Sequence, residues 1–170
     1  RRVGCPNAIV RFLNQELGAQ PPKKHDTVVC NLKKFKPNKK VRYALRNFPV
    51  DEVIQTRDYA AATRFVNDYR KKIGLNPVLE DNIKALNDYG CAKTFIALKD
   101  GEIAGCLSIA AGKKWIIELI AAGWQDEIKM HVIKEYRGSR DYYDLAGYDG
   151  SKRTRFKKKW GEPATVEFVY

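Results

Sequence analysis

Three consecutive apolar runs in the middle of the chain constrain the fold more than any other feature. Asp100-Gly101, between the first two runs, is a strong signal for a two-residue hairpin, because both turn positions need a positive φ. Gly112-Lys113 makes a second tight turn. The pattern predicts a three-stranded antiparallel meander over Cys91–Leu98, Glu102–Ala111 and Lys114–Ala122.

Helical patterns lie on both sides of this meander. The segment Asp58–Gly74 begins at an N-cap residue and ends at glycine, with apolar residues at helical spacing in between. A second helix is expected over Asp81–Tyr89. After the meander, Gln125–Tyr136 carries one apolar stripe, which predicts a third helix packed on the sheet.

Shorter elements complete an α+β order with no internal repeat. Strands are expected over Thr27–Leu32, Val50–Thr56, Tyr142–Leu145 and Ala164–Tyr170. Basic helices are expected over Asn38–Asn47 and from Lys152 to Lys159. Residues 1–25 are predicted to form an N-terminal helix (Asn7–Leu17) and a proline-containing linker, before one domain over residues 26–170.

The charge of the chain points to an anionic partner. The formal net charge is +12, and two blocks, Lys33–Arg46 and Lys152–Lys159, hold much of it. Such a basic face attracts tRNA or another polyanion. A solvated, solubilising surface is the alternative, because charge runs discriminate poorly.

Cysteine spacing and hydropathy narrow the class of protein further. Cys5, Cys30, Cys91 and Cys106 lack metal-ligand spacing, so no metal site is predicted. No apolar run approaches the roughly 18 residues of a membrane span. A cytoplasmic protein with reduced thiols is expected.

The C-terminal segment carries a family resemblance. Asp144 and Gly147 form a D-x-x-G pattern, and Phe156-Lys157 followed by Trp160-Gly161 forms F-K-x-x-W-G. This pair of motifs resembles the signature of the Fem-type branch of the GNAT superfamily. Further similar segments, in the same order, are Val28–Leu32, Lys40–Arg46, the Asp58–Gly74 helix, the Asp100-Gly101 hairpin and Ile103–Gly105.

The resemblance implies a GNAT-like mixed sheet with an antiparallel meander, two splayed central parallel strands and flanking helices. It also implies an activity: an amino acid passes from aminoacyl-tRNA, the co-substrate, to an amine acceptor such as a peptide, a cell-wall precursor or a natural product. No other cofactor is implied. Typical Fem ligases contain two GNAT-like halves, so residues 1–25 can be the remnant of an upstream half, or a partner chain can supply one.

Two other functions stay open. A CoA-dependent N-acyltransferase of the same fold would need a glycine-rich loop that aims backbone N–H groups at a diphosphate. Only Gly123-Trp124 separates the last meander strand from the next helix, so acetyl-CoA is the less favoured donor. The third reading is a non-catalytic, basic RNA-binding domain.

Three residues are the candidates for chemistry: Glu118, Asp144 and Lys157. Glu118 is predicted to share an apolar strand face with Ile116 and Ile120, where low water content suits a proton acceptor. Pairing with a Lys or Arg is the alternative for this carboxylate. Asp144 lies at a strand end where ligand crevices open, with a structural role in the turn at Gly147 as the alternative.

The resemblance places Phe156 and Lys157 against the donor, Phe156 for stacking and Lys157 for a phosphate or a developing negative charge. Packing of Phe156 on Trp160, four residues on, is the alternative. Five further cations are proposed phosphate contacts: Arg42, Arg46, Lys152, Arg153 and Arg155.

Overall fold

The structure, a computed structural model, describes residues 23–90, 92–147, 150–151 and 154–168. The strands are β1 (Lys23–Asn31), β2 (Glu52–Gln55), β3 (Ala92–Lys99), β4 (Glu102–Ala111), β5 (Trp115–Gly123), β6 (Tyr142–Asp144) and β7 (Glu162–Phe168). The helices are α2 (Lys39–Asn47), α3 (Tyr59–Lys72), α4 (Glu80–Asp88), α5 (Asp126–Tyr136) and the 3-10 helix η1 (Arg155–Lys159).

The strands of the described residues form one seven-stranded mixed sheet in the order β2-β3-β4-β5-β6-β1-β7. β3, β4 and β5 are the predicted meander, and Asp100 and Gly101 both have positive φ at its first turn. β5 and β6 pair in parallel. The α+β, GNAT-like mixed sheet that the sequence indicated is therefore confirmed.

The two parallel strands separate soon after they meet. Pairing runs from Trp115 with Tyr142 to Ile117 with Asp144. β6 ends there, whereas β5 continues to Gly123. The splay of the central strands thus begins at Glu118.

The N-terminal strand lies inside the sheet. β1 pairs antiparallel with β6 on one side and with β7 on the other. It begins at Lys23, four residues before the predicted strand, so part of the predicted linker belongs to the sheet. The predicted helix Asn7–Leu17 lies outside the described residues.

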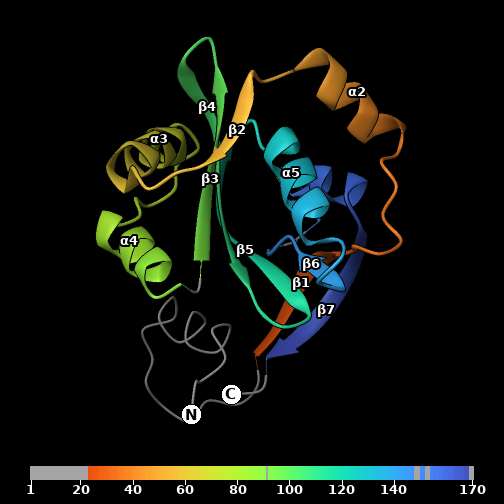
Figure 1. The fold of residues 1–170 in the computed structure, drawn as a ribbon. Coiled ribbons are helices and arrows are strands. Elements are labelled where there is room, and N and C mark those ends of the chain that lie inside the picture. Colours follow the sequence, from red (N-terminus) through yellow and green to blue (C-terminus); the bar gives the residue numbers. More distant parts are fainter. Residues whose placement is uncertain (1–22, 91, 148–149, 152–153, 169–170) are drawn as a thin grey trace.

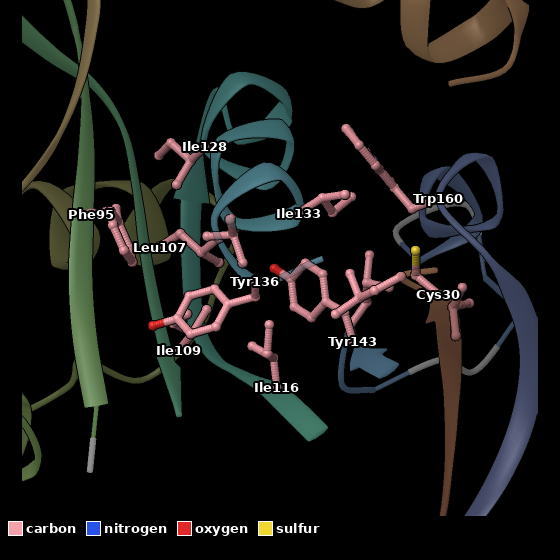
Figure 2. Close-up of a cluster of buried hydrophobic side chains, with 14 of the residues drawn as sticks. Cys30, Phe95, Leu107, Ile109, Ile116, Ile128, Ile133, Tyr136, Tyr143 and Trp160 are labelled. Atoms are coloured by element: carbon pink, nitrogen blue, oxygen red, sulfur yellow. The ribbon is translucent and has the colours of Figure 1, made fainter. Parts of the chain in front are cut away.

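Helices cover both faces of the sheet (Figure 1). α2 and α5 lie on one side, and α3 and α4 lie on the other. The larger core lies between α5 and the sheet, where Figure 2 shows Ile128 on the side of α5 near Phe95 and Leu107, and Ile133 on the side toward Trp160. A smaller cluster under α3 contains Ala62 and Val66. No helix in the described ranges is long and apolar enough to cross a membrane.

The predicted helices form for the expected local reasons. The Asp58 carboxylate accepts a hydrogen bond from the Ala61 N–H and begins α3. The Asn38 side chain does the same for Val41 at the start of α2. α2 buries Val41 and Ala44 and exposes its cations, as an amphipathic basic helix should.

The second basic helix differs from the prediction in type. Of the described residues in the predicted range, Arg155–Lys159 form a 3-10 helix rather than an α-helix, and Lys152 and Arg153 lie outside the described residues. Clustered like charges destabilise a longer α-helix. In addition, a Cβ at Gly161 would lie 2.2 Å from the Val29 carbonyl oxygen, so the chain must turn against β1 directly after Trp160. β7 accordingly starts at Glu162 rather than Ala164.

Candidate active site

A cavity of about 660 Å³ opens where β5 and β6 part. We call it the splay cavity. Glu118 and Gln125 lie in its wall on the β5 side, Phe156 and Lys157 line it from η1, and Arg70 lines it from the end of α3. Three residues that the sequence proposed for chemistry or donor binding, Glu118, Phe156 and Lys157, are therefore brought together.

A β-bulge aims Glu118 into this region. Ser108 of β4 pairs with Ile120, and the next residue, Ile109, pairs with Glu118. Leu119 is therefore an extra residue in β5, and the side chains on its two sides point to different faces. Glu118 stays on the α5 face with Ile116, but Ile120 packs under α3. The prediction that all three share one face was wrong for Ile120.

Glu118 is only 5% exposed and lies among cations and a phenol. The Lys129 ammonium is 3.3 Å from Oε2, and the Lys157 ammonium is 3.9 Å from Oε1. The Tyr143 hydroxyl donates to Oε2 at 3.3 Å. We call these four residues the Glu118 cluster. The predicted alternative, an ion-paired glutamate, is thus present at a site that also opens to a cavity.

Tyr143 stays protonated in this setting. Burial raises the pKa of its phenol well above the usual value, and the Glu118 charge raises it further. Figure 2 shows its ring inside the α5-facing core, between Ile116 and Cys30. The phenol is therefore a fixed hydrogen-bond donor to the carboxylate.

Lys129 is the site residue that sequence reasoning missed. It is fully buried, and its ammonium also donates to the Gln125 side-chain oxygen at 2.8 Å. A signal was available: Lys129 precedes Ile133 by four residues and Tyr136 by seven, which are positions of the buried helix face. A lysine in an apolar stripe needs a buried anionic partner.

Asp144 lies beside this cluster but is bound differently. Its Oδ1 accepts hydrogen bonds from the Thr27 hydroxyl and from the Ala146 N–H, the latter at 2.8 Å. Ala146 has a positive φ of 44°, so this contact supports a strained turn. Asp144 is 2% exposed and does not line the splay cavity. These contacts favour the structural alternative over a catalytic one.

Lys157 joins the two carboxylate environments. Its ammonium donates to the carbonyls of Leu145 at 2.6 Å, Ala146, and Gly147 at 3.2 Å. It also faces Glu118. Lys157 therefore holds the turn after β6 against η1 and, at the same time, forms part of the cavity wall.

Phe156 and Trp160 do not pack on each other as an α-helical spacing would allow. In a 3-10 helix, residues three apart lie on one side and residues four apart do not. Phe156 lines the splay cavity with 43% exposure, and the Lys129 ammonium lies 5.3 Å from its ring centre. Trp160 is buried on the other side of η1, stacked on Phe35 at 5.8 Å.

Three of the proposed phosphate-binding arginines, Arg42, Arg46 and Arg155, are absent from the lining of the cavity, and Lys152 and Arg153 lie outside the described residues. Arg42 and Arg46 are exposed on α2, where they donate to the Pro37 and Arg42 carbonyls. Arg155 is exposed on η1 and donates to the Gly150 carbonyl. They are surface cations near the site rather than parts of its wall.

The start of α5 is poorly suited to a diphosphate. Its first turn carries Asp126 and Glu127, and carboxylates already occupy the positive end of the helix dipole. Lys159 pairs with Asp126 at 2.5 Å. Among the described residues, no group of three or more His, Cys, Asp or Glu is placed to hold a metal ion.

Solved structures provide the comparison. FemX matches with a TM-score of 0.68 at 11% identity, covering 85% of this chain and 61% of FemX. The C-terminal domain of a putative lysylphosphatidylglycerol synthetase from Agrobacterium fabrum matches with a TM-score of 0.61 at 15% identity, covering 95% of this chain and 65% of that one. The chain thus spans less than two thirds of the length of either structure.

A GNAT family acetyltransferase from Brucella melitensis, in complex with acetyl-CoA, matches with a TM-score of 0.51 at 16% identity over 70% of this chain and 88% of that one. No protein-family model and no curated protein sequence matches. At these identities the likeness concerns the fold alone. The predicted resemblance to Fem-type and GNAT proteins is confirmed at that level, and the protein has the fold that FemX shares with GNAT acetyltransferases.

Proposed function

We propose that this protein transfers an aminoacyl group from aminoacyl-tRNA to an amine acceptor, with the reaction in the splay cavity. The observation that carries the proposal is the position of Glu118. A buried carboxylate stands where the parallel strands part, and the same cavity is lined by Phe156 and Lys157.

The chemistry asks for groups of this kind. The amine nitrogen attacks the ester carbonyl, a C–N bond forms, and the C–O bond to the terminal ribose breaks. Glu118 accepts the proton that the amine loses and returns it to the departing ribose oxygen. The Lys129 and Lys157 ammonium groups lie 3.3 Å and 3.9 Å from the Glu118 carboxylate and hold it at the cavity.

The donor end has an aromatic and a cationic neighbour. Phe156 is exposed enough at the cavity to stack on a terminal base, and a stacked base contributes about 1–3 kcal/mol. Lys157 adds positive charge beside it. Arg70, at the opposite wall, is a further cation for a phosphate or for the acceptor.

An aminoacyl ester fits better than acyl-CoA at the start of α5. A CoA diphosphate would meet the Asp126 and Glu127 carboxylates there. Since the acetyl-CoA complex of the Brucella melitensis protein has the same fold, CoA-dependent acyl transfer is the alternative to be tested beside the first.

The experiment uses total tRNA charged with radiolabelled amino acids, mixed with the pure protein and a panel of amines: amino acids, peptides and cell-wall precursors. The expected result is loss of label from tRNA and its appearance in one amine. Glu118→Gln should slow this transfer by about 10²–10⁴-fold. A parallel mixture contains labelled acetyl-CoA.

The outcomes of this experiment distinguish the candidate functions. Transfer from acetyl-CoA alone would move the protein to CoA-dependent acylation. Equal binding of charged and uncharged tRNA, with no transfer to any amine, would leave an RNA-binding domain and refute the proposal.

A further inference from the structure

A second cavity, of about 440 Å³, lies on the other side of η1 from the splay cavity. One wall comes from the segment after β1 and carries Lys34 and Lys36. The other comes from η1 and carries Lys158 and Lys159. We call it the lysine groove.

The walls of the groove are held in fixed positions. The Asn38 amide donates to the Lys159 carbonyl at 2.8 Å, which ties one wall to the other. The Phe35 ring stacks on Trp160, and Arg137 donates to the Phe35 carbonyl at 2.8 Å. These contacts hold the backbone of the two walls together without a ligand.

The charge of the groove is positive. Lys34 and Lys36 are exposed and form no ion pair with a carboxylate in the described part of the chain. Lys159 is paired with Asp126, and Glu162 adds one carboxylate to the lining. The balance favours an anion that can reach both walls.

We infer that the lysine groove holds the phosphodiester backbone of RNA next to the aminoacylated end that enters the splay cavity. This inference rests on the proposed function for its choice of ligand. Consecutive residues of η1 serve the two cavities, Lys157 the first and Lys158 the second, so one strand can contact both. Lysines on facing walls suit a single RNA strand that enters the groove between them. A membrane surface, in contrast, would contact only the side chains that point outward.

The test measures the affinity of an uncharged RNA hairpin with a single-stranded 3′ end as a function of salt, by fluorescence anisotropy. The variant Lys34→Glu/Lys36→Glu should bind more weakly. Its plot of log affinity against log salt should be shallower by about 1.4 to 1.8, which corresponds to two lost phosphate contacts. The milder Lys34→Ala/Lys36→Ala variant should lower the slope as well.

The matched control is Arg64→Glu/Lys84→Glu, which reverses two exposed cations on α3 and α4, across the sheet from α2 and α5 (Figure 1). It should keep the wild-type slope. Equal losses in the control and the groove variants would overturn the inference, and so would a groove variant that binds RNA normally but loses binding to phosphatidylglycerol vesicles.

Failure of the groove inference can be told apart from failure of the proposed function. Wild-type protein that transfers label from charged tRNA while the groove variants keep full RNA affinity would refute the groove alone. Conversely, a shallower slope in the groove variants, with no transfer by wild-type protein, would refute the proposed function and leave the groove as an RNA site.

Discussion

Two buried carboxylates lie within one step of each other on the sheet and have opposite surroundings. Glu118 follows Ile117, which is the register partner of Asp144, but the two side chains lie on opposite faces. Neutral groups of the fold, a hydroxyl and a backbone N–H, bind Asp144. Two ammonium groups and a phenol surround Glu118, which opens to the splay cavity.

The comparison shows that, where two parallel strands diverge, one carboxylate can support the backbone while its neighbour faces a cavity. A carboxylate that accepts hydrogen bonds from a neighbouring hydroxyl and a backbone N–H supports a turn, and Asp144 does not line the splay cavity. A carboxylate that pairs with ammonium groups at the edge of a cavity remains accessible to a ligand, and burying such an ion pair costs desolvation energy. We expect substitutions in the first region to change stability, and substitutions in the second to change both stability and transfer.

The largest effect is expected from breaking the buried ion pair. Lys129→Met removes the nearer ammonium group and leaves Glu118 with the Tyr143 hydroxyl and the more distant Lys157 ammonium. We expect the free energy of unfolding to fall by about 3–5 kcal/mol. Urea unfolding measures it. The double variant Lys129→Met/Glu118→Gln should recover most of the stability but not the transfer rate. A loss below about 1 kcal/mol, typical of exposed pairs, would contradict a buried pair.

The next effect concerns the other carboxylate. Asp144→Ala leaves two hydrogen-bond donors, the Thr27 hydroxyl and the Ala146 N–H, without their acceptor. We expect each to lower the free energy of unfolding by about 1–3 kcal/mol. Asp144→Asn keeps an acceptor oxygen and should lose less. If Asp144→Asn unfolds like wild type in urea yet transfers as slowly as Glu118→Gln, Asp144 takes part in the reaction and the contrast fails.

Lys157 tests the link between the two regions. Lys157→Met removes the charged hydrogen bonds to the Leu145 and Gly147 carbonyls, and we expect a loss of about 1.5–3 kcal/mol in unfolding free energy. The donor affinity should fall as well. Lys40→Met, which removes an exposed cation of α2, is the control for stability; an equal loss there would assign the effect to the removal of a lysine charge in general.

The smallest effect is expected from the phenol. Tyr143→Phe should cost about 1 kcal/mol at neutral pH, because Lys129 still contacts Glu118.

Tyr143 should also affect how the free energy of unfolding depends on pH. Burial raises the pKa of Cys30 and of Cys106 to about 12, and it raises the pKa of Tyr143 well above its usual value. In the unfolded chain, thiols ionise near pH 8.5 and phenols near pH 10. The unfolded state therefore loses protons first, and the unfolding free energy should fall as pH rises from about 8.5.

Urea unfolding at several alkaline pH values measures this decline. Tyr143→Phe should remove only the part above about pH 10, and Cys106→Ala only a part that starts near pH 8.5. A wild-type stability that stays constant up to pH 11 would show that these three groups ionise equally in both states.

Local patterns predicted the elements whose signals are local. Asp58 begins α3, and the Asp100-Gly101 turn has the positive φ values that its composition demands. The placement of β1 could not be predicted in this way, because its neighbours in the sheet come from the other end of the chain. Nor could the bulge at Leu119, which has no glycine or proline to mark it and which alone sends Ile120 to the other face.

The site was predictable in part for the same reason. Glu118, Phe156 and Lys157 belong to a recognisable strand and motif, and the structure places all three in the lining of one cavity. Lys129 could have been found from its place in the apolar stripe of α5. The lysine groove depends on contacts such as that between Asn38 and Lys159, 121 residues apart, which no short pattern contains.

The position of β1 also has a consequence for the order of assembly. This strand leaves the ribosome before its partners in the sheet. The Thr27 hydroxyl bonds to Asp144, 117 residues further on, and Asp26 accepts a hydrogen bond from Thr165, 139 residues further on. Sheet pairing at such sequence separation is slow, and an unpaired apolar strand is prone to aggregate. The half of the sheet that carries β6, β1 and β7 should therefore complete last, and chaperone dependence during synthesis should be concentrated there.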